Sequence, residues 1–182
     1  QVSQLEFVQC FPEGAESVQY LSGRGTLEIE EEQRLQHSTI FDCPVSISSQ
    51  GSLHTEGVTL YLNYPIQCRG NLTLSNTRVI SNYLESGDMF LLEHAQGCQI
   101  LNSQLDGRGK TSGMFATGTR LYVKGSMFRN MKGGRAIYNA LSPVIEQSIF
   151  NYCQNGGISC RGGSIKNCHF VNCRDKNGAG IM

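Results

Sequence analysis

Apolar and polar residues alternate along most of the chain over short stretches, as they do in short, half-buried β-strands. No long window places apolar residues at the i, i+3, i+4, i+7 spacing of an amphipathic helix. Gly, Asn and Ser separate the apolar stretches, and these residues favour tight corners. The pattern therefore predicts an all-β protein built from many short strands.

A repeat occurs three times in the last third of the chain. An apolar residue is followed by a small residue, then by phenylalanine, then by a Gly-rich turn and a further short strand. The phenylalanines are Phe128, Phe150 and Phe170, spaced 22 and 20 residues apart, and the small residues are Ser126, Ser148 and Cys168. The equal spacing predicts that these residues occupy equivalent positions in successive structural units.

A looser version of the repeat runs through the first half. Gly-x-Leu begins at Gly25, Gly51 and Gly70, and Ile-x-Cys-Arg-Gly occurs at 66–70 and again at 158–162. Leu105 takes the phenylalanine position in the segment 100–107. Counted from Leu27 to Phe170, the anchors predict about seven units of roughly 20 residues each.

Units of this length with two or three short strands are typical of the coils of a parallel β-helix. Coils stack about 4.8 Å apart, so equivalent side chains lie above one another, which explains the recurring phenylalanine. An antiparallel sandwich or barrel has similar strands but does not predict such a ladder. We expect Asn130 and Asn172 at corners of the coil, where asparagine tolerates a left-handed backbone.

The repeat also divides the chain. Residues 1–24 are predicted to form an N-terminal cap or lead-in, and residues 25–182 the β-helix. The charged segment from Glu30 to Gln36 is either a short helical cap or a charged loop. Because the chain begins at Gln1 and stops inside a strand pattern at Met182, we expect further coils or domains of a parent chain beyond both ends, with truncation at the C-terminus.

The last unit supports a family resemblance. Ile165-Lys166-Asn167-Cys168-His169-Phe170-Val171-Asn172-Cys173, followed by Gly178-Ala179-Gly180-Ile181, resembles the repeat of bacterial β-helix proteins in the pectate-lyase-like superfamily. The resemblance is close from about Leu121 onward and looser from Gly25 to Gly118. It implies a single-stranded, right-handed parallel β-helix. That superfamily includes lyases, hydrolases, epimerases, adhesins and scaffolds, so it implies no single activity.

Composition limits the partners. Only 16% of the residues are charged and the formal net charge is zero, which argues against nucleic-acid binding. No apolar run approaches the roughly 20 residues that span a membrane. The eight cysteines lack the close spacing of a zinc site, and an even number permits disulfides without requiring them. We favour small buried thiols in a reducing, cytoplasmic compartment, with a secreted or cell-surface location as the alternative.

The chain offers little catalytic chemistry. The resemblance includes polygalacturonase-type hydrolases. Those enzymes contain the sequences Asn-x-Asp, Asp-Asp and Gly-His-Gly, and none of the three occurs in this chain. The segment Leu105-Asp106-Gly107-Arg108-Gly109-Lys110 resembles a turn of that family outside its catalytic set, and we expect a Gly-bent corner with solvated charges. His169 is expected to be an exposed strand residue. We predict no catalytic residue, no cofactor and no metal ligand.

Two hypotheses follow for the function. The first is a non-enzymatic recognition or scaffold domain that binds a protein or glycan partner along a stacked face. The second is a polysaccharide lyase or glycoside hydrolase, which requires at least two carboxylates close together. The candidate binding residues are Asp106, Arg108 and Lys110, the densest polar group, together with Arg78, Arg129, Asn130, Tyr152 and Asn172.

Overall fold

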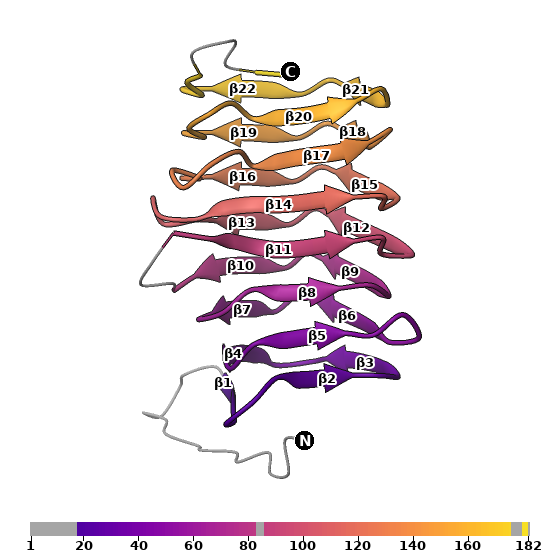
Figure 1. The fold of residues 1–182 in the computed structure, drawn as a ribbon. Coiled ribbons are helices and arrows are strands. Elements are labelled where there is room, and N and C mark those ends of the chain that lie inside the picture. Colours follow the sequence, from indigo (N-terminus) through magenta and orange to yellow (C-terminus); the bar gives the residue numbers. More distant parts are fainter. Residues whose placement is uncertain (1–17, 83–85, 176–179, 182) are drawn as a thin grey trace.

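The protein is represented by a computed structural model, which describes residues 18–82, 86–175 and 180–181. Within these residues the chain forms three parallel sheets that run the length of a single stack (Figure 1). Sheet A contains, in spatial order, β1 (Val18–Ser22), β4 (Ser38–Asp42), β7 (Thr59–Leu62), β10 (Arg78–Ser81), β13 (Gln104–Asp106), β16 (Met127–Arg129), β19 (Ile149–Asn151) and β22 (His169–Val171).

The other two sheets follow the same order along the stack. Sheet B contains β2 (Leu27–Ile29), β5 (Val45–Ile47), β8 (Ile66–Cys68), β11 (Asp88–Glu93), β14 (Ser112–Thr117), β17 (Ile137–Leu141) and β20 (Ile158–Arg161). Sheet C contains β3 (Glu32–Leu35), β6 (Ser52–Glu56), β9 (Asn71–Ser75), β12 (Gly97–Leu101), β15 (Leu121–Lys124), β18 (Val144–Glu146) and β21 (Ser164–Lys166).

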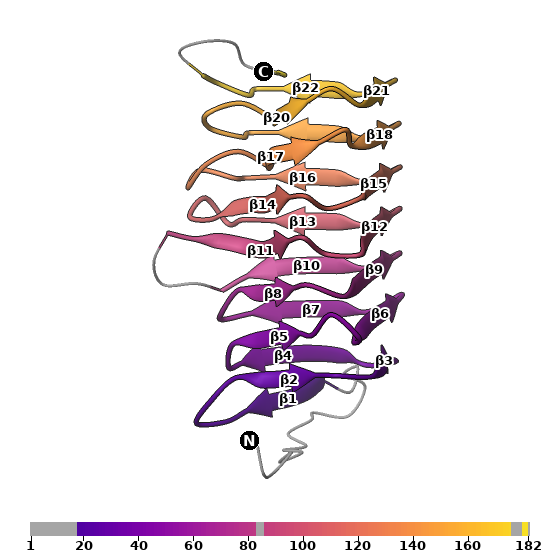
Figure 2. The ribbon, with the colours of Figure 1, turned by 45° about the vertical axis from the view of Figure 1, so that its right-hand side comes forward.

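Each coil places one strand in sheet A, the next in sheet B and the third in sheet C, and the chain then rises to the next level (Figure 2). The described strands complete seven such coils, and β22 begins another. The parallel β-helix predicted from the repeat is therefore confirmed, and the antiparallel sandwich is wrong. No helix in the described part of the chain is long and apolar enough to cross a membrane.

The phenylalanine ladder lies inside the stack. Phe128 pairs in register with Phe150, and Phe150 with Phe170. The ring centroids are 5.2 and 5.0 Å apart, with interplanar angles of 13° and 11°. Leu105 lies directly opposite Phe128, as the sequence predicted. Such stacked rings bury a large apolar area and add a favourable ring–ring interaction.

A second ladder of small residues lines the corner between sheets C and A. The Ser126 hydroxyl accepts a 3.0 Å hydrogen bond from the Ser103 amide, and the Ser148 hydroxyl accepts one of 3.2 Å from the Ser126 amide. Ser103, Ser126 and Ser148 are all buried. These hydroxyls satisfy backbone groups that leave the strand ladder at the corner, which explains why small polar residues recur there.

The corners depend on a left-handed backbone. Asn130 and Asn172 have φ of 57° and 52° at the corner between sheets A and B, which confirms their predicted role. The corner between sheets C and A repeats the conformation at every level from β6 to β22. The residues there are Gly57, Asn76, Asn102, Gly125, Gln147 and Asn167, with φ between 46° and 66°. Glycine and asparagine enter this region at the lowest cost, which explains why they recur at this corner.

Two sequence predictions need correction. The segment from Glu30 to Gln36 is not a helical cap or a charged loop: Glu32–Leu35 forms β3, which pairs with β6. Helical propensity gives way here because the neighbouring coil offers a complete row of backbone partners. The Gly-x-Leu alignment is also wrong in part. Leu53 and Leu72 are in register in sheet C, whereas Leu27 lies in sheet B opposite Val45.

Candidate functional site

The structure brings together three of the residues that the sequence singled out, Asp106, Arg129 and Asn130. One carboxylate oxygen of Asp106 accepts hydrogen bonds from the Arg129 guanidinium at 2.8 and 2.7 Å. The other oxygen accepts from the Asn130 amide at 3.0 Å and from the Arg108 backbone N–H at 2.9 Å. Asp106 is only 7% exposed. The predicted corner is present, but its carboxylate is buried and paired rather than solvated.

These contacts set the charge state of Asp106. Burial alone would raise the pKa of its carboxyl. The hydrogen bonds from Arg108 N–H and Asn130 and the charge of Arg129 outweigh burial, and the net effect lowers the pKa. Asp106 is therefore a carboxylate at neutral pH with both oxygens occupied, which describes a structural ion pair better than a catalytic acid or base.

The remaining predicted residues do not gather into one site. The Arg108 side chain donates to Asn82 at 2.7 Å and lies, like Lys110, on the exposed surface of the corner. Arg78 is exposed on the outer face of sheet A, in register with Gln104. Tyr152 is 52% exposed. Asn172 and Tyr152 belong to the left-handed corner positions between sheets A and B, so backbone geometry already accounts for their placement.

The other aspartates are also engaged. Asp42 accepts hydrogen bonds from the Tyr20 hydroxyl and, at 2.7 Å, from the Asn63 amide, and these lower the pKa of its carboxyl. Asp175 forms a 3.0 Å ion pair with Arg135. The Asp42 contacts link adjacent coils, whereas the Arg135–Asp175 pair spans two coil levels.

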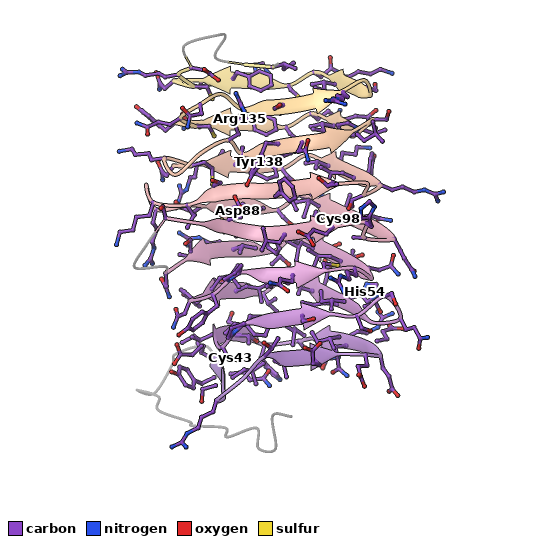
Figure 3. The ribbon with its side chains drawn as sticks, in the orientation of Figure 1. Cys43, His54, Asp88, Cys98, Arg135 and Tyr138 are labelled. Atoms are coloured by element: carbon purple, nitrogen blue, oxygen red, sulfur yellow. The ribbon has the colours of Figure 1, made fainter. Side chains whose placement is uncertain are left out.

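The fourth aspartate, Asp88, lies on the outer face of sheet B (Figure 3). It accepts a 2.6 Å hydrogen bond from the hydroxyl of Tyr138, two strands away, and both lie on this face in Figure 3. Burial and the hydrogen bond to Asp88 raise the pKa of Tyr138. The Tyr138 ring lies 5.2 Å from that of Phe115 on the intervening strand. The Asp88–Tyr138 hydrogen bond therefore connects β11 to β17 across the outer face of β14.

Glutamates gather at the end of the stack formed by β1, β2 and β3. Glu28, Glu30 and Glu31 line a hollow of about 360 Å³ there. The rest of its lining is mainly core side chains of the first coils, including Leu21, Ile29 and Phe41. Among the described residues, the hollow thus combines apolar core side chains with acidic residues at its edge.

A larger concavity, which the sequence did not reveal, lies along sheet C. We call it the sheet C groove, and its volume is about 630 Å³. It is lined by Asn71, Gln96, Gly97, Cys98, Gln99, Gly118, Thr119, Arg120, Leu121, Tyr122, Leu141, Ser142 and Val144. These residues come from four successive coils, so the groove runs along the axis of the stack.

The outer surface of the groove combines apolar and polar groups. Gln99, Tyr122 and Val144 follow one another in register on β12, β15 and β18. Leu141 is 56% exposed and Val144 is 36% exposed, which makes them two of the most exposed aliphatic side chains described. Gln96 is held at the edge, since its amide donates to the Ser49 carbonyl at 2.6 Å and accepts from Asn71 at 3.3 Å.

Charge is distributed unevenly along the chain. Residues 1–93 contain 12 Asp and Glu against 4 Lys and Arg, whereas residues 94–182 contain 3 against 11. The overall neutrality thus conceals formal charges of −8 and +8 in the two parts. Most of the groove lining lies in the positive part, and Arg120 is exposed within it.

Among the described residues, the cysteines are not joined by a disulfide. In the described part of the chain the cysteines are free thiols, four of them buried and three partly exposed. Cys10 lies outside the described residues. Among those that are described, no three His, Cys, Asp or Glu side chains gather to hold a metal ion. His169 is exposed, as predicted.

Only one signal in the sequence marks the groove. Leu141-Ser142-Pro143-Val144 places two aliphatic residues around a proline at a corner, where polar residues are usual. The groove itself arises because residues 96–99, 120–122 and 141–144 stack, and that register requires the fold.

Comparison with protein-family models, with curated proteins and with solved structures gives no match.

Proposed function

We propose that the chain is a non-enzymatic recognition domain that binds an extended segment of a protein partner in the sheet C groove. The observation that carries this proposal is the exposure of Leu141 and Val144 beside Tyr122 on a rigid, stacked surface. Tyrosine and arginine are enriched where protein partners bind, and exposed aliphatic groups gain free energy when a partner covers them. The parallel sheet holds these side chains in place before binding, which limits the entropic cost.

The dimensions of the groove suit a short extended segment. Four coil levels contribute to it, and three spacings of about 4.8 Å give a length of about 14 Å. An extended peptide rises about 3.3 Å per residue, so the groove contacts about four residues. Affinity from so short a segment is modest, and repeated segments or a second contact on the partner would increase it.

The chemistry of the groove favours a protein over a glycan. A peptide side chain can cover Leu141 and Val144 with apolar atoms, whereas sugar hydroxyls placed there would lose hydrogen bonds to water. Tyr122 is the single aromatic residue in the lining, and it supports the same peptide by stacking and by its hydroxyl. Arg120 and the positive charge of residues 94–182 select segments in which an acidic residue accompanies the apolar one.

A selection from a random peptide library tests the proposal. We expect the immobilised protein to enrich peptides that combine an acidic with an aliphatic or aromatic residue. The same selection on a Tyr122→Ala/Leu141→Ser variant should lose this enrichment, and Arg78→Ala, on sheet A, should retain it. A parallel array of neutral and acidic glycans provides the comparison. Binding of the native protein to a glycan, without enrichment of any peptide, would overturn the proposal.

The carbohydrate-active alternative rests on one observation, the glutamates at the edge of the hollow near β2 and β3. Glu28, Glu30 and Glu31 line the same hollow, and glycoside hydrolysis needs two carboxylates close together. Membership of the pectate-lyase-like superfamily, which the repeat suggests, is part of this proposal. An assay for shortening of acidic polysaccharides tests it. We expect no product, and product that disappears with Glu28→Gln would favour the enzyme.

A further inference from the structure

Cys153 and Cys173 occupy equivalent positions on successive coils, each three residues after a stacked phenylalanine. The next residues, Gln154 and Arg174, form a parallel bridge, and the Arg174 amide donates to the Cys153 carbonyl at 3.0 Å. The two cysteine Cα atoms are therefore about one strand spacing apart, about 4.8 Å. A disulfide bridges Cα separations of about 4.4 to 6.8 Å, so this pair needs no movement of the backbone.

The two thiols also have equivalent orientations, since each points to a carbonyl of the coil before its own. Cys173 Sγ lies 3.3 Å from the Phe150 carbonyl oxygen, and Cys153 Sγ lies 3.9 Å from that of Phe128. Rotation of the side chains away from these weak bonds brings the sulfurs together.

The environments of the two thiols differ. Cys153 is buried, whereas Cys173 is partly exposed. A solute therefore reaches Cys173 first. The hydrogen bond donated by Cys153 favours the thiolate of Cys173 and lowers its pKa, and the same contact together with burial raises the pKa of Cys153. The thiolate is the reactive form of cysteine, so exposure and charge state select the same residue.

We propose that Cys173 and Cys153 form a peroxide-responsive thiol pair that closes into a disulfide between the last two coils. The Cys173 thiolate attacks one oxygen of hydrogen peroxide, which forms an S–O bond, breaks the O–O bond and releases hydroxide. The Cys153 sulfur then attacks the sulfenic sulfur, which forms the S–S bond and expels the oxygen as water together with the Cys153 proton. Two thiols are oxidised by two electrons, and one peroxide becomes two waters.

The other partly exposed thiols lack this arrangement. Cys160 lies opposite Ala140 in sheet B. Cys168 occupies the small-residue ladder, where the preceding position is Ser148, and its thiol points to the carbonyls of Lys166 and Ile145. These two cysteines therefore serve as matched controls, because they share the exposure of Cys173 but not its neighbouring thiol.

The disulfide would join β22 to the coil below it. Beyond β22 the described residues pair with the preceding coil through two isolated bridges, Gln154–Arg174 and Ile158–Ile181. A covalent link across that junction restricts separation of the final coil. The oxidised protein should accordingly resist proteolysis after Arg174 more than the reduced protein does.

Peptide mapping of the whole chain tests the pair. The reduced protein is treated with hydrogen peroxide, alkylated, and digested with trypsin without reduction. We expect an intact mass lower by about 2 Da before alkylation, from the loss of two hydrogens. Residues 136–161 and 167–174 should appear as one linked peptide, with fragmentation placing the link at Cys153 and Cys173.

Two variants control the result. Cys160→Ser/Cys168→Ser removes the other cysteine from each tryptic peptide and should leave the link unchanged. Cys173→Ser should reduce the oxidation of Cys153 by about ten-fold or more, because the buried thiol loses the residue that reacts with peroxide. A link through Cys160 or Cys168, a disulfide between two copies of the chain, or oxidation of Cys173 to a sulfinic acid with Cys153 still alkylatable would each overturn the proposal.

Discussion

Arg129 and Asp106 face each other on neighbouring strands of sheet A, and two charge-assisted hydrogen bonds join them at 2.8 and 2.7 Å. The Asp106 side chain is 9% exposed and that of Arg129 is 33% exposed. The pair fastens the corner after β13 to the coil that follows it. A corner that the sequence marked as a binding candidate thus serves first to hold two coils together.

Replacing Asp106 by asparagine should lower the free energy of unfolding by about 1–3 kcal/mol. Asparagine retains an acceptor for the Arg108 amide, but Arg129 loses its partner charge in a partly buried site. The midpoint of urea unfolding measures the loss. Arg78→Gln, at an exposed position of the same sheet, is the control and should change the midpoint little. Equal effects of the two substitutions would show that the ion pair contributes nothing.

The same pair predicts a dependence on pH. The carboxyl of Asp106 has a lowered pKa in the folded protein, so it binds a proton more readily in the unfolded chain, where its pKa is about 3.9. Its contribution to stability is therefore complete above that value and is lost as the pH falls through the folded pKa. The difference in stability between the native protein and Asp106→Asn should be constant from pH 6 to 7 and shrink below about pH 4. A difference that grows on acidification would contradict the assigned pKa direction.

The phenylalanine ladder predicts unequal losses along the stack. Phe150 is fully buried and stacks on both Phe128 and Phe170, so Phe150→Ala should cost about 3–5 kcal/mol of unfolding free energy. Phe170 is partly exposed and has one stacked neighbour among the described residues, so Phe170→Ala should cost less, about 1–3 kcal/mol. Denaturant unfolding of both variants measures the difference. A larger loss of unfolding free energy for Phe170→Ala than for Phe150→Ala would contradict the continuous phenylalanine ladder.

Gln147 offers a stabilising substitution. It occupies the left-handed corner position with φ of 51°, where other coils carry glycine or asparagine. Gln147→Asn should raise the free energy of unfolding by about 0.5–1 kcal/mol, because asparagine enters this conformation more easily. Gln67→Asn, on β8 and exposed, is the matched control and should give no gain. A thermal melt compares the two, and destabilisation by Gln147→Asn would contradict the corner geometry.

The repeat in the sequence contained most of the fold. The spacing of Phe128, Phe150 and Phe170 specified one residue per coil, and the structure places Leu105 in the same row. The prediction for the segment around Glu32 is wrong, because helical propensity is local whereas pairing with β6 is not. The prediction for Leu27 is wrong for a similar reason: a short Gly-x-Leu string does not specify which of the three sheets it enters.

The candidate site was less accessible to sequence reasoning. The sequence indicates Asp106 and Arg129 as candidate binding residues, but their pairing and burial depend on side chains that stack from the next coil. The sheet C groove depends on the register of Gln99, Tyr122 and Val144, which lie more than 20 residues apart in sequence. The uneven charge could have been counted from the sequence, although its relation to the groove requires the fold.

Affinity for a selected peptide is the most direct test of the recognition role. Binding should be measured by titration calorimetry for the native protein, for Tyr122→Ala/Leu141→Ser and for Arg78→Ala. Loss of two contact residues worth about 1 kcal/mol or more each should weaken binding by at least about ten-fold, and Arg78→Ala should leave it unchanged. Equal affinity of the native protein and the groove variant would contradict the assignment of the sheet C groove as the binding site.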